Sequence, residues 1–93
     1  MTLAEECIQQ LSEMLDLQAK YDERCFEING IEGEYEGLPL NKALLDEIGE
    51  LNHALKPEWC WWGRGGKEVD REHVLEEWVD CVHFILAKYL ASS

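Results

Sequence analysis

Residues 44–51 read LLDEIGEL, and the pattern of this stretch decides the predicted fold. Leucine and isoleucine recur there, and on either side, at spacings of three and four residues, which is the pattern of one apolar face of an α-helix. Glu47 and Glu50 lie on one flank of that face. Two carboxylates so close repel each other and raise each other's pKa unless a cation lies between them. The stretch therefore predicts a helix that carries either a metal site or a solvated acidic flank.

The size and charge of the chain limit what it can be. Its 93 residues suffice for one small domain, so we predict a single domain over residues 1–93. Lys and Arg total 8 against 20 for Asp and Glu, and the resulting net charge of -12 repels nucleic acid and anionic membranes. A phosphate-bearing ligand would therefore need divalent metal and local cations to bind.

The cysteines and the hydropathy of the sequence indicate its compartment. The four cysteines are widely spaced and form no CxxC pair. The sequence has neither a secretory signal nor an apolar run long enough to span a membrane. We therefore expect a soluble cytoplasmic protein with reduced thiols.

Apolar residues at helical spacing predict an all-α fold. The three long helices are expected over residues 2–24, 39–55 and 70–90. Thr2 and Asp70 are good N-caps for the first and third of these helices, and Pro39 suits the first turn of the second. Since three helices cannot close a four-helix core alone, we predict a tight homodimer in which the partner completes the bundle and part of each pocket.

A glycine-rich segment with clustered tryptophans separates the second and third predicted helices. Residues 58–67 contain three of the four tryptophans of the chain and three glycines. Indoles in such a loop either plug the core or form a stacking surface for a planar ligand. Arg64 and Lys67, close by in the sequence, suit a base that carries phosphates.

A second pair of acids, Glu77 and Asp80, lies on the third predicted helix with the spacing of the first pair. If the two helices are antiparallel, all four carboxylates converge on one small volume. Four carboxylates in a packed bundle are tolerable only around bound cations, and hard oxygen ligands suit Mg²⁺ or Mn²⁺. The sequence therefore predicts a magnesium site formed by Glu47, Glu50, Glu77 and Asp80.

The two acid pairs and their flanks resemble the signature of the all-α nucleoside triphosphate pyrophosphatases, the group that contains MazG and the dimeric dUTPases. The pattern is Glu47-x-x-Glu50, a gap of 26 residues and Glu77-x-x-Asp80. Residues 45–51 and 75–86 are similar to the paired helices of dimeric dUTPases. The resemblance implies a MazG-like domain over residues 1–93 that hydrolyses (deoxy)nucleoside triphosphates between the α and β phosphates. The products would be a monophosphate and pyrophosphate, in house-cleaning of the nucleotide pool.

The resemblance also implies roles for individual residues. The four acids would hold Mg²⁺, with Glu47 and Glu50 as catalytic candidates and Glu47 favoured to orient or deprotonate the attacking water. Phe84 would lie against the sugar, where a ribose 2′-hydroxyl would clash. The candidates for the remaining substrate contacts are Lys56, Arg64, Lys67 and Arg71 for the phosphates, and Trp61 and Trp62 for the base.

The sequence differs from its relatives in length, and its acids permit two other interpretations. Dimeric dUTPases continue well past the third helix whereas this sequence stops at Ser93, so we expect a MazG-like enzyme without strict uracil specificity. MazG-like relatives often pair dimers into tetramers, which makes a dimer of dimers the expected assembly. Alternatively, Glu50-x-x-His53 and Asp80-x-x-His83 resemble the Glu-x-x-His pairs of di-iron carboxylate bundles. The acids could also merely solvate a non-catalytic helical adaptor.

Overall fold

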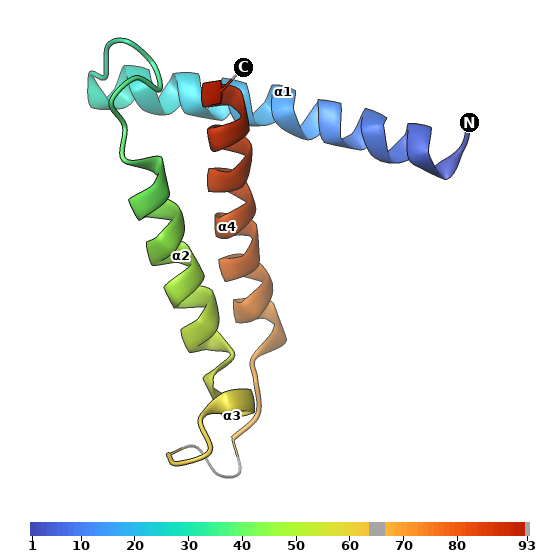
Figure 1. The fold of residues 1–93 in the computed structure, drawn as a ribbon, viewed down its shortest axis with the longest axis vertical. Helices are drawn as coiled ribbons and strands as arrows, with labels where there is room; N and C mark the ends of the chain where they lie inside the picture. Colours follow the sequence, from blue (N-terminus) through green and yellow to red (C-terminus); the bar gives the residue numbers. More distant parts are fainter. Residues whose placement is uncertain (64–66, 93) are drawn as a thin grey trace. The chain divides into compact units, whose positions relative to one another are not determined.

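The computed structural model describes residues 1–63 and 67–92, and these residues form helices and turns without a strand (Figure 1). This confirms the predicted all-α class. The helices are α1 (Leu3–Asn29), α2 (Leu40–Ala54), α3 (Lys56–Trp59) and α4 (Arg71–Ser92). The chain forms two compact units, one made of Met1–Leu38 with Leu86–Ser93 and the other of Pro39–Ile85. A single functional domain and a bundle completed by dimerisation stay predictions.

In the first unit, α1 begins as predicted but continues past its predicted end. The hydroxyl of Thr2 accepts a hydrogen bond from the backbone N–H of Glu5 at 3.1 Å, which confirms Thr2 as the N-cap. The helix ends at Asn29 rather than near Arg24 because Gly30, at φ 65°, adopts the left-handed conformation that terminates helices. The N–H groups after Asn29 bond back to carbonyls of the last turn and satisfy them.

The connector after α1 is held against that helix by a buried hydrogen-bonded group. Asp22, 8% exposed, accepts hydrogen bonds from Gln18 at 2.8 Å and from the hydroxyl of Tyr35 at 2.7 Å. The Tyr35 ring also packs edge-on against Phe26, with ring centroids 5.1 Å apart. Burial, and next to it the hydrogen bond to Asp22, raise the pKa of Tyr35. The connector is therefore an ordered segment fastened at Tyr35.

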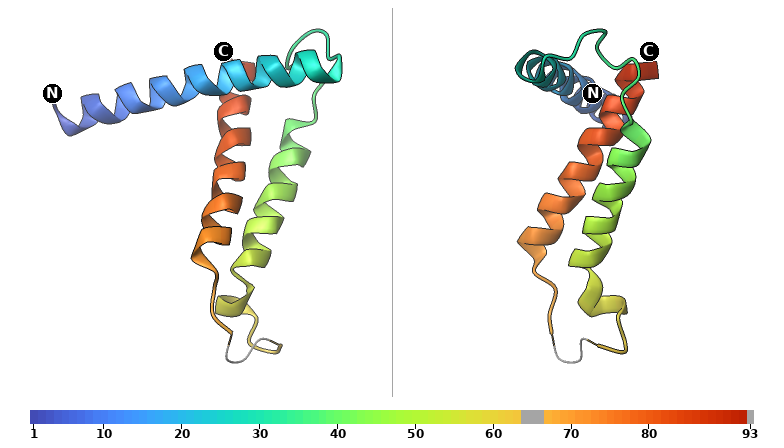
Figure 2. Two further views of the ribbon diagram at one scale, coloured as in Figure 1. Left: turned by 180° about the vertical axis from the view of Figure 1, so that it is seen from behind. Right: turned by 90° about the vertical axis from the view of Figure 1, so that its left-hand side faces the viewer.

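In the second unit, α2 and the part of α4 up to Ile85 lie side by side and run in opposite directions (Figure 2). The bounds of α2 differ from the predicted ones by one residue at each end. Before α4, one carboxylate oxygen of Asp70 accepts hydrogen bonds from the backbone N–H groups of Glu72 and His73, at 3.1 and 3.3 Å. This confirms Asp70 as the cap of the third long helix.

The tryptophan-rich segment starts with a short helix that the sequence pattern did not predict. α3 follows α2 almost directly, and the indole N–H of Trp59 ties it back to the carbonyl of Asn52 at 2.8 Å. Trp59 and Trp61 each meet Trp62 edge-on, with centroids 6.0 and 5.5 Å apart. Trp61 is 89% exposed and Trp62 66% exposed, so within the described chain these two indoles form a surface and not a plug of the core.

Much of the apolar surface of the helices is left uncovered by the described residues. The buried apolar side chains of the described residues are Cys60, Cys81, Leu86 and Ala87. Large apolar residues are exposed on α2 and on α4, including Leu45, Ile48, Leu75, Trp78, Val79 and Ile85. All four cysteines have free thiols. Among the described helices, none combines the length and apolar character needed to cross a membrane.

Candidate metal centre

Three of the four predicted metal ligands meet between α2 and α4. One carboxylate oxygen from each of Glu47, Glu77 and Asp80 lies within 4.8 Å of the other two. Glu77 and Asp80 share one face of α4 because they are three positions apart on a helix, and that face is turned toward Glu47 on α2. The antiparallel helix pair thus brings together acids that are far apart in the sequence.

Two oxygens of this acid group are buried without partners. Oε2 of Glu47 and Oε2 of Glu77 have almost no solvent-accessible surface and accept no hydrogen bond from the described residues. Burial is the largest cause that raises the pKa of both carboxyl groups, and the neighbouring Glu50 raises them further. His73, with Nε2 3.9 Å from Oε1 of Glu77, acts in the opposite direction on the pKa of Glu77.

The donor set of the acid group fits a divalent cation. Buried carboxylate oxygens without partners cost free energy, and a bound cation removes this cost. Hard oxygen donors are the ligands that Mg²⁺ and Mn²⁺ prefer. The three residues Glu47, Glu77 and Asp80 are therefore suited to hold such an ion.

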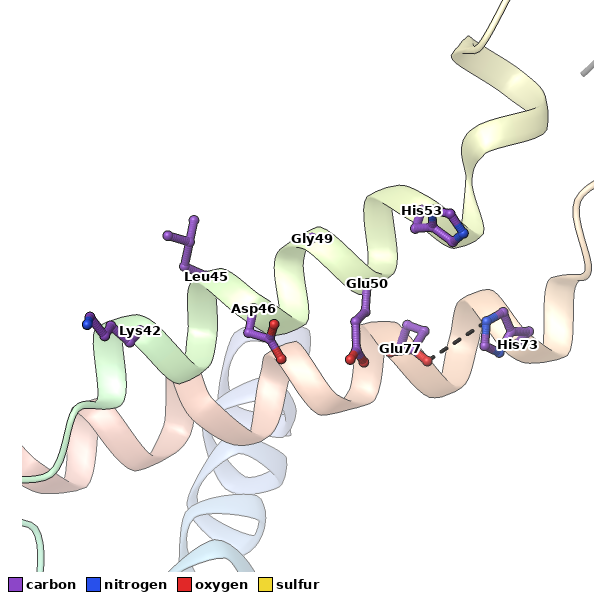
Figure 3. A pocket seen from close by; sticks show the side chains of 8 residues that line it. All are labelled: Lys42, Leu45, Asp46, Gly49, Glu50, His53, His73 and Glu77. Atoms are coloured by element: carbon purple, nitrogen blue, oxygen red, sulfur yellow. Dashed lines mark ion pairs between the residues drawn. The ribbon is translucent and has the colours of Figure 1, made fainter. Parts of the chain in front are cut away.

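Glu50 connects the acid group to a pocket of about 760 Å³ that runs along α2 and the first turns of α4 (Figure 3). Glu50 itself is exposed. Figure 3 shows Glu50 of α2 and Glu77 of α4 next to each other in the middle of the pocket lining. The other polar residues that line the pocket are His53 and His73 toward one end, and Lys42 and Asp46 toward the other.

Among the described residues, the substrate contacts predicted from the sequence are not part of the lining of this pocket. Lys56 and Phe84 are half-buried, and the other described candidates, Trp61, Trp62, Lys67 and Arg71, are exposed. Phe84 lies one helical turn beyond Asp80 on α4. Arg64 lies outside the described residues. The contacts of all seven residues with a substrate stay predictions.

Sequence reasoning missed Lys42, His53 and His73 as pocket residues, although helical spacing contained the signal. Lys42 and His53 lie on the same face of α2 as Glu50. His53 follows Glu50 by three positions, and Lys42 precedes it by about two helical turns. His73 precedes Glu77 by four positions, the spacing at which side chains meet on a helix. What the sequence could not provide was the register of α4 against α2.

The remaining chemistry around the acids favours carboxylate ligation over a di-iron site. Within the described residues, the three donor atoms that lie within 4.8 Å of one another are all carboxylate oxygens. His73 approaches Glu77 to 3.9 Å but does not join this group, whereas di-iron bundles use histidine nitrogens as ligands. Cys81 follows Asp80 and is buried. Burial, followed by repulsion from Glu47, raises the pKa of this thiol, so it stays neutral beside the acid group.

Comparison with known proteins agrees with the arrangement of the acids. A family model described as dUTPase matches residues 10–92, which include both acid pairs and the pocket. No curated protein and no solved structure matches the chain. The family match extends the resemblance seen in the two acid-bearing helices to nearly the whole chain, and at the family level the function is that of a nucleotide pyrophosphatase-like hydrolase. The chain belongs to the dUTPase family, within the all-α nucleoside triphosphate pyrophosphatases.

Proposed function

We propose that this chain is a Mg²⁺-dependent pyrophosphohydrolase that cleaves deoxynucleoside triphosphates between the α and β phosphates. Its role would be house-cleaning, the removal of unwanted nucleotides from the nucleotide pool. The family match supports nucleotide hydrolysis in general. The observation that carries the finer proposal is the meeting of Glu47, Glu77 and Asp80, with two unpartnered buried oxygens, beside a pocket. At about 760 Å³ this pocket is in the size range of small-molecule sites.

The reaction assigns separate tasks to the acids. Held by Glu47, Glu77 and Asp80, Mg²⁺ would supply the positive charge that neutralises a triphosphate and polarises the attacked phosphorus. Glu50 is exposed and lines the pocket, so it can accept a proton from a water there. Its access to water makes Glu50 the better general base, whereas one oxygen of Glu47, favoured from sequence, is closed off from solvent.

In the proposed step, the water oxygen forms a bond to the α-phosphorus while the bond from that phosphorus to the α,β-bridging oxygen breaks. The proton of the water passes to the Glu50 carboxylate, and the electron pair of the broken bond leaves with pyrophosphate. Glu50 then returns its proton to solvent, which restores the carboxylate for the next cycle.

The substrate preference is a further part of the proposal. We propose, from the resemblance to dimeric dUTPases, that the ring of Phe84 lies against the sugar. A half-buried phenyl ring one turn from Asp80 is suited to exclude a 2′-hydroxyl. We therefore propose a preference for deoxyribose over ribose. Because of the family match, dUTP is the first substrate to test.

Self-association is proposed from the exposed apolar face of α4. Leu75, Trp78, Val79 and Ile85 recur at helical spacing and are 45% to 56% exposed. Large apolar side chains gathered on one face mark interaction surfaces. The partner that we propose for this face is a second copy of the chain, in a homodimer that can pair into a dimer of dimers. The described residues form three long helices and one short helix, so a second copy is needed to complete a four-helix bundle.

The reaction is tested by following pyrophosphate release from canonical and modified nucleoside triphosphates, each as a deoxy and ribo pair, with Mg²⁺ or with a chelator. We expect Mg²⁺-dependent release of pyrophosphate and a faster reaction with the deoxy member of each pair. In ¹⁸O-labelled water, the label should enter the monophosphate. Release of orthophosphate, label in pyrophosphate, or no turnover of any nucleotide would contradict the proposed reaction.

A further inference from the structure

The pocket beside the acids has two chemically different ends. At one end, Lys42 and Asp46 are four positions apart on α2, so the lysine has an anionic neighbour on its own helix. Leu45 lies between them in the sequence, lines the pocket and is 70% exposed. This end therefore offers an apolar surface and a lysine that has an acidic residue four positions away on its own helix.

The other end carries two imidazoles from two helices. Glu47 on α2 faces Glu77 and Asp80 on α4, and the helices are antiparallel, so His53 lies about level with His73. Nε2 of His73 is 3.9 Å from Oε1 of Glu77, which places this end directly beside the acid group. Each helix thus contributes one possible hydrogen-bond donor to this end of the pocket, and His73 lies one turn from the candidate ligand Glu77.

Between the two ends, the surface of α2 at Gly49 is open among the described residues. Leu45, Gly49 and His53 follow one another at spacings of four positions along α2, so they form a single line on the helix surface. A Cβ atom built on Gly49 would meet no atom within 4 Å. An extended ligand can therefore lie along α2 from Leu45 to His53 and pass Glu50 in the middle.

We propose that His53 and His73 bind the pyrophosphate part of the substrate, while the Leu45 end takes the nucleoside part; this inference rests on the proposed function. The polarity follows from the chemistry of the two ends, since phosphate oxygens need donors and a nucleoside needs apolar contact. In a chain with a net charge of -12, imidazole N–H groups offer hydrogen bonds to an anion where few cations are present. The α-phosphate then lies beside Glu50, where the water attacks.

The test compares the two products as separate ligands in isothermal titration with Mg²⁺ present. His53→Ala and His73→Ala should each weaken the binding of pyrophosphate about 10- to 100-fold, the usual range for losing a hydrogen bond to a charged group. Neither substitution should change the affinity for the deoxynucleoside monophosphate of the best substrate by more than about twofold. Leu45→Ala should show the converse pattern.

Conservative variants and inhibition kinetics separate this proposal from a structural role of the histidines. His53→Gln and His73→Gln keep an N–H donor and should therefore bind pyrophosphate almost as tightly as the wild type. Product inhibition by pyrophosphate should likewise be strong in the wild type and the Gln variants and weak in the Ala variants. Thermal unfolding checks that each variant is folded. If His73→Ala unfolds, the His53 variants still test the proposal, because His53 forms no ion pair with a predicted metal ligand among the described residues.

Two outcomes would overturn the assignment. If the wild type releases pyrophosphate while both histidine variants bind pyrophosphate as tightly as the wild type, the polarity is wrong and the proposed function stands. If Leu45→Ala weakens the binding of pyrophosphate and the histidine variants weaken the binding of the monophosphate, the ligand lies in the reverse direction. Absence of any hydrolysis by the wild type would instead remove the proposed function and the inference with it.

Discussion

Glu50 is the acid whose surroundings differ from those of the other three, because it is exposed and lines the pocket while Glu47, Glu77 and Asp80 are half-buried. We expect Glu50→Gln to lower kcat by about 10²- to 10⁴-fold, the range for loss of a general base. The fold should be kept or slightly stabilised, since the change removes a charge that repels Glu47 and Glu77. Steady-state kinetics and circular dichroism check both statements; a variant as fast as the wild type would exclude Glu50 as the base.

The buried acids predict how stability depends on pH without metal. The pKa values of Glu47 and Glu77 are raised above the ordinary value of 4.5, first by burial and next by Glu50. The folded protein thus holds these protons more tightly than the unfolded chain. Their contribution to stability is complete below about pH 4.5 and is lost as the pH rises through the raised values. We expect the Tm of the metal-free protein to fall as the pH rises from about 4.5 toward neutrality.

Mg²⁺ should reverse this loss because it binds the ionised carboxylates. At neutral pH, a concentration 100-fold above Kd should stabilise the fold by about 2.7 kcal/mol. Glu47→Gln is the control: it should flatten the pH dependence of Tm and reduce the increase caused by Mg²⁺. An equal Mg²⁺ effect in Glu47→Gln and the wild type would show that the ion binds elsewhere.

The acids could be identified from sequence because helical spacing determines which side chains share a face. Glu47 and Glu50, and likewise Glu77 and Asp80, were assigned to common faces without knowledge of the fold. The difference between Glu50 and Glu47 in solvent access could not be predicted, since it depends on how α4 covers α2. The same contact decides that His73 reaches the pocket.

At the scale of the elements, α2 contains a glycine that the isolated chain does not require. Gly49 lies in the middle of the helix, where glycine is less favourable than alanine by about 0.5–1 kcal/mol, and no neighbour excludes a Cβ atom. We expect Gly49→Ala to raise the Tm and to weaken nucleotide binding, because the methyl group narrows the pocket. Asn52→Ala is the matched control on the same helix: it should also raise the Tm but leave the affinity unchanged. Undiminished affinity in Gly49→Ala would mean that no ligand approaches this backbone.

The connector between α1 and α2 depends on one hydroxyl group. Tyr35→Phe removes the hydrogen bond to Asp22 and leaves one oxygen of a buried carboxylate without that partner. We expect a loss of about 1–3 kcal/mol in the free energy of unfolding, measured with urea. Tyr89→Phe, at a tyrosine that is 60% exposed, is the control and should cost much less. Equal losses in the two variants would show that the buried hydrogen bond adds nothing to stability.

Local signals explain which element boundaries were predictable. The N-caps Thr2 and Asp70 were read correctly because a cap depends on the side chain and the next few residues. The predicted end of α1, near Arg24, is too early because Glu27 and Asn29 interrupt the apolar pattern without breaking the helix. Gly30 was the better stop signal. The short helix α3 is tied to α2 by the hydrogen bond from the Trp59 indole to the Asn52 carbonyl, a contact that the periodicity of the sequence does not reveal.

For the whole molecule, the exposed apolar face of α4 predicts the state of assembly. The chain has a mass of 10.8 kDa, so light scattering should give twice or four times this value. Leu75→Glu places a charge on the face and should produce monomers. Glu76→Gln, next to Leu75, is the control and should leave the assembly intact. A monomeric wild type, or an unchanged mass for Leu75→Glu, would remove the proposal that this face is the interface.

The all-α class of the whole molecule was predictable from apolar spacing alone, whereas its packing was not. Leu75 and Val79 were assigned to a core face, yet within the chain they are 56% and 45% exposed. A sequence pattern shows that a face is apolar but not which molecule covers it.

The acids that meet at the candidate metal centre belong to two helices joined by a long connecting segment, and this has a consequence beyond catalysis. An ion shared by Glu47, Glu77 and Asp80 would act as a clasp that holds α2 to α4. Chelation should then speed amide hydrogen exchange in both helices at once. The amides of the connector, which the hydrogen bond from Tyr35 to Asp22 holds against α1, should exchange as slowly as before. Scarcity of divalent metal would in this way loosen the scaffold itself and leave the protein open to proteolysis, so that its abundance would follow the supply of the ion.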